Sequence, residues 1–244
     1  MRKKLLYNTS INKKLCGILS VSNVSKEVVV ICHARYSSKD SRVTFLISEY
    51  LTDNNVNNFR FDFVSCGESE GNYMDYTITS MINNLHDTLE ILNNNYGFTS
   101  FILIGCSLGG RIVSLVDTVK FDIKKIILWY PALNYKKYFK LPSKEEKIAK
   151  KIGYAVIEHN NKLSYNYYLD NHNYNAFKNL KKLDLPILFV HGKLDAFVSY
   201  KCSRNISKKC KNAKLILIDN GDHGFHNDIC MNKTLEETLN FINK

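Results

Sequence analysis

The sequence has little proline and glycine: only three proline and eleven glycine residues in 244. Collagen-like chains, proline-rich chains and flexible linkers need many more of these residues, which fix or free the backbone, so those architectures are excluded. The hydrophobic share of 45% and the charged share of 23% lie close to the averages of globular proteins. We therefore expect an ordered chain with one large α/β domain and an insertion.

Long hydrophobic runs are also missing. The longest apolar segments are all far shorter than the roughly 20 residues that cross a bilayer, and they are Val28–Cys32, Phe101–Cys106 and Ile126–Leu133. The basic start of the chain is followed by polar residues, Asn8–Ser10, before the apolar stretch of a signal peptide can form. We therefore expect no membrane span and a cytoplasmic protein.

The seven cysteines form no CxxC pair, and their number is odd. Two of them, Cys32 and Cys106, lie inside apolar runs, where a thiol usually behaves as a small hydrophobic group. Both observations argue against a disulfide framework. We expect reduced thiols.

Acidic residues are fewer than basic ones: the chain has 23 Asp and Glu but 34 Lys and Arg, which gives a net charge of +11. Such a charge attracts nucleic acids and acidic substrates. The excess is nearly all scattered lysine accompanied by abundant asparagine, which the codon bias of an AT-rich genome produces without selection for binding. No basic-aromatic motif of a nucleic-acid binder accompanies it, so we expect no nucleic-acid partner.

Apolar segments rich in β-branched residues alternate with segments of helical periodicity along most of the chain. This alternation predicts βαβ units and a mostly parallel sheet flanked by helices. Residues 1–22 lack helical periodicity and are expected to add an antiparallel hairpin at the sheet edge. The predicted strands are Val28–Cys32, Phe59–Phe63, Phe101–Gly105, Ile126–Tyr130, Pro186–His191 and Lys214–Ile218. The predicted helices are Ser41–Leu51, Asp75–Asn93, Ser107–Val119 and Thr234–Ile242.

The alternation stops between residues 134 and 185, where we predict an inserted cap, so that residues 1–133 and 186–244 form the core domain. Eleven lysines against five acidic residues make this insertion strongly basic. A structureless loop of such length is uncommon, and Lys144–Ile157 is the best helix candidate. The aromatic residues that either wall an apolar cleft or pack the cap against the sheet are Tyr135, Tyr138, Phe139, Tyr154, Tyr165, Tyr167, Tyr168, Tyr174 and Phe177.

Residues Gly105–Gly109 read Gly-Cys-Ser-Leu-Gly and fit the G-x-S-x-G pattern, with a predicted strand before it and a predicted helix after it. In this pattern the serine lies on a strained strand-to-helix turn, and the glycines avoid clashes with neighbouring groups. Ser107 is therefore the candidate nucleophile. The alternative is a serine that only caps the following helix.

A serine nucleophile needs a general base, and the base needs an orienting acid. In the chain order Ser, then Asp or Glu, then His, both partners follow Ser107. Asp195 and His223 each come just after a predicted strand, at the sheet edge where open α/β sheets bind their ligands. Without a catalytic role, the acid would cap a turn or a helix and the histidine would be a solvated loop residue. The competing residues are Asp219 and Asp222 for the acid and His226 for the base.

With these residues the chain resembles the α/β-hydrolase superfamily, and within it the small bacterial cinnamoyl (feruloyl) esterases. The resemblance implies an α/β-hydrolase fold with an inserted cap, and hydrolysis of ester bonds without a metal or another cofactor. It also implies that Ser107, Asp195 and His223 form a catalytic triad. The features that carry it span nearly the whole chain and are the loop at His33, the segments Arg60–Phe63 and Gly67–Gly71, the elbow at Ser107, the cap after Pro131, Asp195 and His223.

The resemblance further implies an oxyanion hole, in which two backbone N–H groups bind the negative charge of the reacting carbonyl oxygen. The donors here would be Arg35 and Leu108. Relatives usually have His-Gly-Phe where this chain has His33-Ala34-Arg35, so alanine replaces a glycine that can need a positive φ, and a cation stands beside the acyl site. We expect His33 to hold this loop. The loop Ser65–Ser69, where relatives commonly show Gly-His-Gly-x-Ser, is expected to be structural.

The leading hypothesis is a serine carboxylesterase that hydrolyses small acyl or aromatic-acyl (cinnamoyl or feruloyl-like) esters through an acyl-enzyme on Ser107. Fold and triad do not fix the leaving group, so a thioesterase, a serine peptidase or an acyltransferase stays open. A hydrolase-like protein that binds without catalysis is a third hypothesis, supported only by the altered loop at Ala34. The expected partner is a small-molecule ester, and a homodimer stays open.

Overall fold

The computed structural model describes residues 1–134, 141–157 and 162–244. Its strands are β1 (Arg2–Asn8), β2 (Lys14–Ser20), β3 (Glu27–Cys32), β4 (Asn58–Phe61), β5 (Ser100–Cys106), β6 (Ile123–Trp129), β7 (Tyr154–Val156), β8 (Lys162–Ser164), β9 (Ile187–Gly192) and β10 (Ala213–Ile218). Its helices are α1 (Arg42–Asp53), α2 (Ile78–Tyr96), α3 (Leu108–Val113), α5 (Ser143–Ile152), α6 (Tyr165–Asn171), α7 (Ala176–Leu180), α8 (Tyr200–Ser207) and α9 (Asp228–Ile242).

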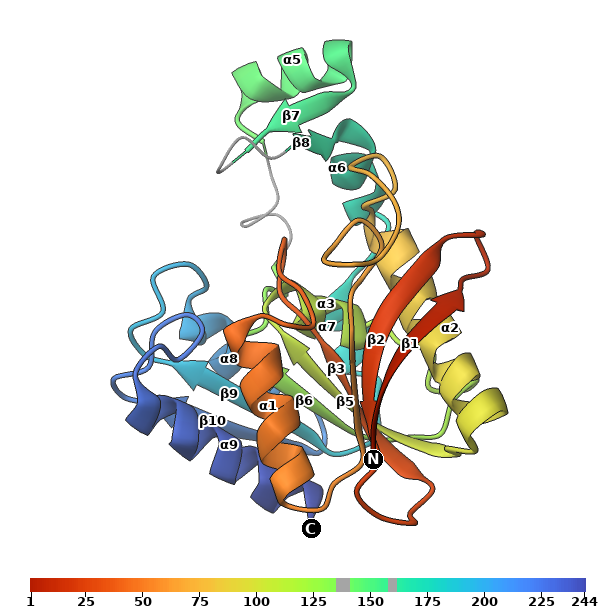
Figure 1. Cartoon of the computed structure of the whole chain (residues 1–244). Helices are drawn as coiled ribbons and strands as arrows, with labels where there is room; N and C mark the ends of the chain where they lie inside the picture. The colour runs from red at the N-terminus through yellow and green to blue at the C-terminus, as the bar shows by residue number, and fades with distance from the viewer. Residues whose placement is uncertain (135–140, 158–161) are drawn as a thin grey trace.

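An eight-stranded sheet crosses the molecule in the order β1-β2-β4-β3-β5-β6-β9-β10 (Figure 1). Every neighbouring pair from β4 to β10 in this order is parallel. Strand β1 pairs with β2, and β2 with β4, in antiparallel fashion. The predicted parallel sheet with an antiparallel hairpin at its edge is therefore confirmed.

Helices cover both faces of this sheet, with α1 and α9 on one face and α2, α3, α7 and α8 on the other (Figure 1). Successive side chains of a strand point to opposite faces. In β3, Val29 and Ile31 pack with α1 and α9, whereas Val28 and Val30 pack with the helices of the other face. Both faces of β3 are buried, which explains its unbroken apolar run.

Helix α2 begins three residues later than predicted because Thr77 caps it. Thr77 Oγ1 accepts a hydrogen bond from the Ser80 N–H (3.1 Å), and Ser80 Oγ accepts one from the Thr77 N–H (3.0 Å). The helix continues beyond the predicted end at Asn93, because its C-terminal stop is Gly97 in the left-handed region (φ +73°).

Helix α3 is shorter than predicted, since it ends at Val113 and not at Val119. Asp117 Oδ1 accepts hydrogen bonds from the N–H groups of Val119 (2.9 Å) and Lys120 (3.2 Å). This side chain builds a turn at the place where a longer helix would need the backbone for its own hydrogen bonds.

The last helix, α9, begins at Asp228 and not at Thr234, because Asn227 Oδ1 caps it by accepting from the N–H groups of Ile229 (2.9 Å) and Cys230 (3.3 Å). Helix α8 was not predicted. It has eight residues, which is too short for helical periodicity to stand out in the sequence.

The insertion contains helices and a small hairpin. The helix predicted for residues 144–157 ends at Ile152, because Gly153 adopts a left-handed φ of +85°. The following residues form β7, which pairs with β8 in antiparallel fashion. Figure 1 shows α5, β7, β8 and α6 standing beyond the edge at which the parallel strands end. The aromatic residues Tyr135, Tyr138 and Phe139 lie outside the described residues.

Arg111 of helix α3 ties the insertion to the core. Its fully buried guanidinium donates hydrogen bonds to the Leu133 carbonyl (3.1 Å), to Asn171 Oδ1 (2.7 Å) and to the Tyr174 carbonyl (2.9 Å). Leu133 follows β6, whereas Asn171 ends α6. One side chain therefore fixes the start of the insertion and its last third against the helix that follows the elbow.

Helix α7 lies within the predicted cap but belongs to the layer of helices on the sheet. Leu180 is fully buried in the same cluster as the residues of α2 and α3, and Asn179 Nδ2 donates to the Ser114 carbonyl (2.7 Å). The helix leads into β9 and so occupies the crossover position between β6 and β9. The domain boundary at residue 185 stays a prediction.

The buried side chain of Lys39 holds the loop that follows β3 in place. The side chains of Lys39 and Asp62 are 1% and 0% exposed, and Lys39 Nζ lies 3.1 Å from Asp62 Oδ2. The same ammonium lies 2.5 Å from Glu68 Oε2 and 2.8 Å from Asp40 Oδ2. Arg60 pairs with Asp40 and donates to the Lys39 carbonyl (2.5 Å). Burial lowers the pKa of Lys39, but its hydrogen bonds to the three carboxylates outweigh burial and raise this pKa.

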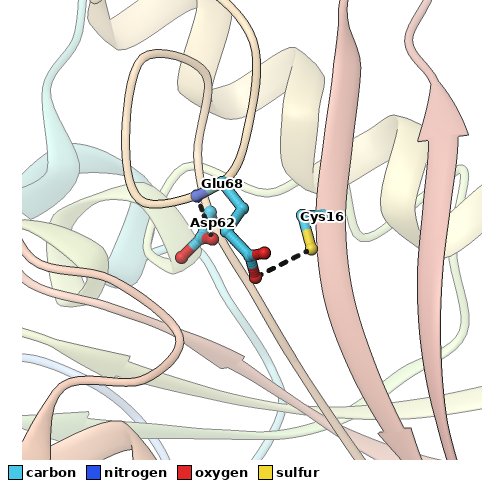
Figure 2. Close-up of side chains that lie close together, drawn as sticks. All are labelled: Cys16, Asp62 and Glu68. Carbon is cyan, nitrogen blue, oxygen red and sulfur yellow. Dashed lines mark hydrogen bonds between the residues drawn. The ribbon is translucent and has the colours of Figure 1, made fainter.

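The Asp62 carboxylate also fixes two loops through their backbones. Its Oδ1 accepts from the Lys39 N–H (2.6 Å), and its Oδ2 accepts from the Glu68 N–H (2.9 Å). Gly67 has a φ of +51°, and a Cβ there would lie 2.3 Å from Asp62 Oδ2, so only glycine fits. Figure 2 shows the Asp62 and Glu68 carboxylates beside the Cys16 thiol of β2. The loop 65–69 therefore has the structural role that we expected.

The first prediction is that Lys39→Met lowers the free energy of unfolding by about 3 kcal/mol, because it leaves the fully buried Asp62 carboxylate without its cation. Urea denaturation measures the loss. The matched control is Lys4→Met, which removes the exposed partner of the same Glu68 and should cost far less. Equal losses of unfolding free energy for the two variants would show that the burial of Lys39 does not contribute to stability.

Candidate functional site

Ser107 lies on a strained turn between β5 and α3. Its φ of +52° with ψ of −111° is an unfavourable backbone conformation for a residue with a side chain. The backbone around it is fixed, because its N–H donates to the Trp129 carbonyl (3.0 Å) and its carbonyl accepts from the Ala132 N–H (2.9 Å). A Cβ at Gly109 would lie 2.2 Å from the Cys32 carbonyl oxygen, so this glycine lets α3 pack on the end of β3. The geometry matches the elbow that the motif predicts.

Asp195 and His223 meet at the same edge of the sheet. His223 Nδ1 lies 2.8 Å from Asp195 Oδ2, and the Asp195 side chain is fully buried, whereas that of His223 is 20% exposed. Asp195 Oδ1 accepts from the N–H groups of Phe197 (2.9 Å) and Val198 (2.8 Å). These contacts satisfy both oxygens of a carboxylate that would otherwise be costly to bury.

The pKa of Asp195 reflects this environment. Burial alone would raise it, but the hydrogen bonds from His191, His223 and the Val198 N–H outweigh burial and hold the pKa of Asp195 well below its usual value. The carboxylate is therefore charged at neutral pH, as an acid that orients a histidine must be.

His191, a residue that the sequence analysis did not assign to the site, also contacts the acid. It is the penultimate residue of the buried strand β9, and its Nε2 lies 3.2 Å from Asp195 Oδ2 and 2.8 Å from the Val198 carbonyl. Its Nδ1 lies 2.8 Å from Ser203 Oγ of helix α8. The sequence did contain an indication of this role: His191 is a single polar residue at the end of an otherwise apolar predicted strand, four residues before the candidate acid.

The competing residues lie elsewhere. Asp219 is exposed and pairs with Lys193. Asp222 Oδ2 lies 2.7 Å from His226 Nδ1, and both side chains are exposed. Within the described residues neither carboxylate forms a hydrogen bond with His223, whose partner is Asp195. The geometry therefore favours Asp195 as the acid that orients His223.

No hydrogen bond joins the Ser107 hydroxyl to His223 within residues 1–134, 141–157 and 162–244. Tyr130 lies between their strands. Its ring centroid is 4.5 Å from that of His223, and it follows Trp129, whose carbonyl accepts from the Ser107 N–H. The structure thus joins Asp195 to His223 and places Ser107 at the end of β5, which β6 separates from β9. Contacts of this kind are often long in enzymes without substrate.

The loop that carries Arg35 packs against the elbow, since the Cβ that Gly109 lacks would also lie 2.6 Å from the His33 carbonyl oxygen. His33 is buried, and burial lowers its pKa. Its Nε2 accepts from the Phe63 N–H (3.1 Å), so Nδ1 carries the proton and donates to the Ala34 carbonyl (2.7 Å). Both ring nitrogens hold the loop, which is the role we expected for His33.

Alanine at position 34 causes no backbone strain, because its φ is not positive. The left-handed residue of this loop is Tyr36, with a φ of +51°. The left-handed backbone conformation that glycine favours is therefore not needed at Ala34. The roles of the Arg35 and Leu108 N–H groups as an oxyanion hole stay a prediction.

Aromatic rings connect this loop to the insertion. The ring of Tyr36 stacks on Tyr76 at 5.1 Å, and Tyr76 stacks on Tyr167 of α6 at 5.8 Å. Burial raises the pKa of Tyr168 to about 12, against the opposing effect of the Arg35 charge. Arg35 therefore stands close to tyrosines of the insertion. Of the aromatic residues considered for a cleft wall, Tyr167 is fully buried and packs in this stack.

One group of possible metal ligands exists within the described part of the chain: Cys16, Asp62 and Glu68, whose ligand atoms lie within 4.8 Å of one another (Figure 2). The Lys39 ammonium already lies between the two carboxylates and neutralises them. A metal ion would have to displace this buried cation, so the group fits a lysine and not a metal. All seven cysteines are free thiols.

No helix of the described ranges is both long and apolar enough to cross a membrane.

Comparisons with known families identify the chain. Residues 23–175 match the model of a family described as serine aminopeptidase, S33, and residues 169–240 match that of TAP-like proteins. A comparison with curated protein sequences finds no significant match.

Several solved structures share the fold. Est1E from Butyrivibrio proteoclasticus, solved with ferulic acid bound, superposes with a TM-score of 0.82 at 22% identity, over 98% of this chain and 100% of that one. Alpha/beta hydrolase domain-containing protein 10 from mouse gives 0.82 at 16% identity, over 99% and 98%. The Pyrococcus furiosus esterase Pf2001 gives 0.77 at 20% identity, over 100% and 92%. The sheet order, the elbow and the family match agree, and the chain belongs to the serine aminopeptidase S33 family of hydrolases, with the α/β-hydrolase fold.

Proposed function

We propose that the protein is a serine carboxylesterase that hydrolyses small acyl or aromatic-acyl esters through an acyl-enzyme on Ser107. The observation that carries the proposal is the 2.8 Å contact between His223 and the buried, charged Asp195, at the sheet edge that also holds the elbow serine. A histidine oriented by a carboxylate next to an elbow serine is the arrangement that activates a hydroxyl for acyl transfer.

Each residue has a distinct task in this reaction. Ser107 Oγ attacks the ester carbonyl while His223 Nε2 takes the hydroxyl proton, and the N–H groups of Arg35 and Leu108 stabilise the oxyanion. His223 then gives the proton to the leaving alcohol, which departs and leaves an acyl-enzyme. Water, deprotonated by His223, releases the acid and restores Ser107. Asp195 holds the imidazole in the required tautomer throughout.

The family match makes a serine peptidase the second candidate. An aminopeptidase must bind the free α-ammonium group of its substrate, for which it needs nearby negative charge. Here Arg35 belongs to the loop that packs against the elbow, and the insertion carries eleven lysines against five acidic residues. Positive charge on this side opposes an ammonium group and favours a neutral or anionic ester.

We predict that Ser107→Ala and His223→Ala each lower kcat at least about a thousandfold, because the residues of a triad act as a unit. Hydrolysis of p-nitrophenyl esters and of methyl ferulate measures the loss, and circular dichroism checks folding. Labelling by a fluorophosphonate probe should be present in the wild type and absent in Ser107→Ala. A folded variant that keeps more than a tenth of the wild-type rate would place the nucleophile or the base elsewhere.

Asp195→Asn should lower kcat about a thousandfold or more, because the amide neither fixes the tautomer of His223 nor stabilises its charged form. The matched control is Asp222→Asn, which removes a carboxylate near the same loop that bonds to His226. The control should keep nearly full activity in the same assay. The assignment of the acid fails if Asp222→Asn proves to be the damaging change.

Arg35 and the basic insertion should favour esters that carry a carboxylate or a phosphate, by attracting them to the site. Exposed charges are screened over about 8 Å at physiological ionic strength, so this preference in kcat/KM should shrink as salt rises. Neutral esters with the same acyl group should respond little, and Arg35→Ala should weaken the preference. Equal salt responses of the two ester classes in the wild type would eliminate electrostatic selection.

A further inference from the structure

We infer that His191 is a positioning residue of this site, which holds the Asp195 carboxylate in the orientation that His223 needs. The inference rests on the proposed function and extends it to a second histidine. It stands on the hydrogen bonds around the ring of His191, which join helix α8, strand β9 and the loop after β9.

The protonation of one ring nitrogen follows from its partners. The Val198 carbonyl lies 2.8 Å from His191 Nε2 and can only accept, so Nε2 carries a proton. The same N–H faces Asp195 Oδ2 at 3.2 Å. At the opposite side of the ring, Nδ1 lies 2.8 Å from Ser203 Oγ. Both His191 and Ser203 are fully buried, so the ring has no freedom to turn away from Asp195.

These contacts brace the carboxylate from two directions. Asp195 Oδ1 accepts from the Phe197 and Val198 N–H groups, whereas Oδ2 is shared by His191 and His223. Val198 contacts both partners, because its N–H binds Asp195 and its carbonyl binds His191. Without His191, Oδ2 would keep one ring donor and the tight turn from residue 195 to residue 198 would lose its buried support. The carboxylate could then rotate away from His223.

A role in packing alone makes a different prediction. A packing residue affects the free energy of unfolding, and its loss leaves the rate of a folded enzyme unchanged. A positioning residue affects the transition state, where the charge on His223 develops, more than it affects substrate binding. The effect should therefore fall on kcat and spare KM.

The experiment compares His191→Asn with His191→Gln. The amide of asparagine reaches only the place of Nδ1, so it keeps a partner for Ser203 but loses the donor to Asp195. The amide of glutamine reaches the place of Nε2 and keeps that donor. The control is His226→Asn, which changes an exposed histidine of the neighbouring loop. All variants are assayed with a p-nitrophenyl ester and checked by urea unfolding.

We expect His191→Asn to lower kcat about ten- to a hundredfold, the range for loss of a hydrogen bond to a charged group, with KM within about twofold of the wild type. His191→Gln should recover most of kcat, and His226→Asn should leave it unchanged. If His191→Asn does not fold, the comparison of His191→Gln with the wild type decides: a folded glutamine variant with kcat lowered a hundredfold would overturn the inference.

The inference also fails if folded His191→Asn keeps the wild-type kcat, or if both variants lower kcat equally. A wild-type protein that neither hydrolyses esters nor reacts with a fluorophosphonate would instead overturn the proposed function, and the inference with it. The two failures are therefore distinguishable, because the first occurs in an active enzyme and the second in an inactive one.

Discussion

The site depends on one buried charge, the Asp195 carboxylate. Removing a carboxylate from water is costly, and here four N–H donors compensate for the loss: two from the chain just after it and two from histidine rings. These donors come from β9, from the turn that follows it and from the loop after β10. The need to satisfy one carboxylate therefore fixes the relative positions of segments that carry the proposed acid and base.

A second buried carboxylate organises the other side of the same sheet edge. Asp62, at the end of β4, binds the side chain and the N–H of Lys39 and so holds the loop that carries Arg35. His33 holds the start of this loop through Phe63. The elbow at Ser107 lies between the two arrangements. Both use the carboxyl ends of parallel strands, where side chains of neighbouring strands can meet around a substrate.

The local sequence pattern predicted secondary structure correctly wherever the residues of the segment itself decide its conformation. The apolar runs of β3 and β5 are buried on both faces, as their composition indicates. Helix boundaries were less predictable, because Thr77, Asp117 and Asn227 each use a side chain to accept backbone hydrogen bonds and thereby decide where a helix begins or where a turn replaces it. Such contacts depend on the positions of side chains in three dimensions, which the hydrophobic periodicity of the sequence does not predict.

The sequence by itself determined the alternation of strands and helices in the core, the elbow motif around Ser107, and Asp195 and His223 as the candidate acid and base after it. Only the tertiary structure brought Asp195 into contact with His223, brought His191 to the same carboxylate, and joined Arg111 to Asn171. The physical reason is distance along the chain. Asp195 and His223 lie 28 residues apart, and Arg111 and Asn171 lie 60 apart, so their pairing depends on how the strands between them assemble and not on any local preference of the residues.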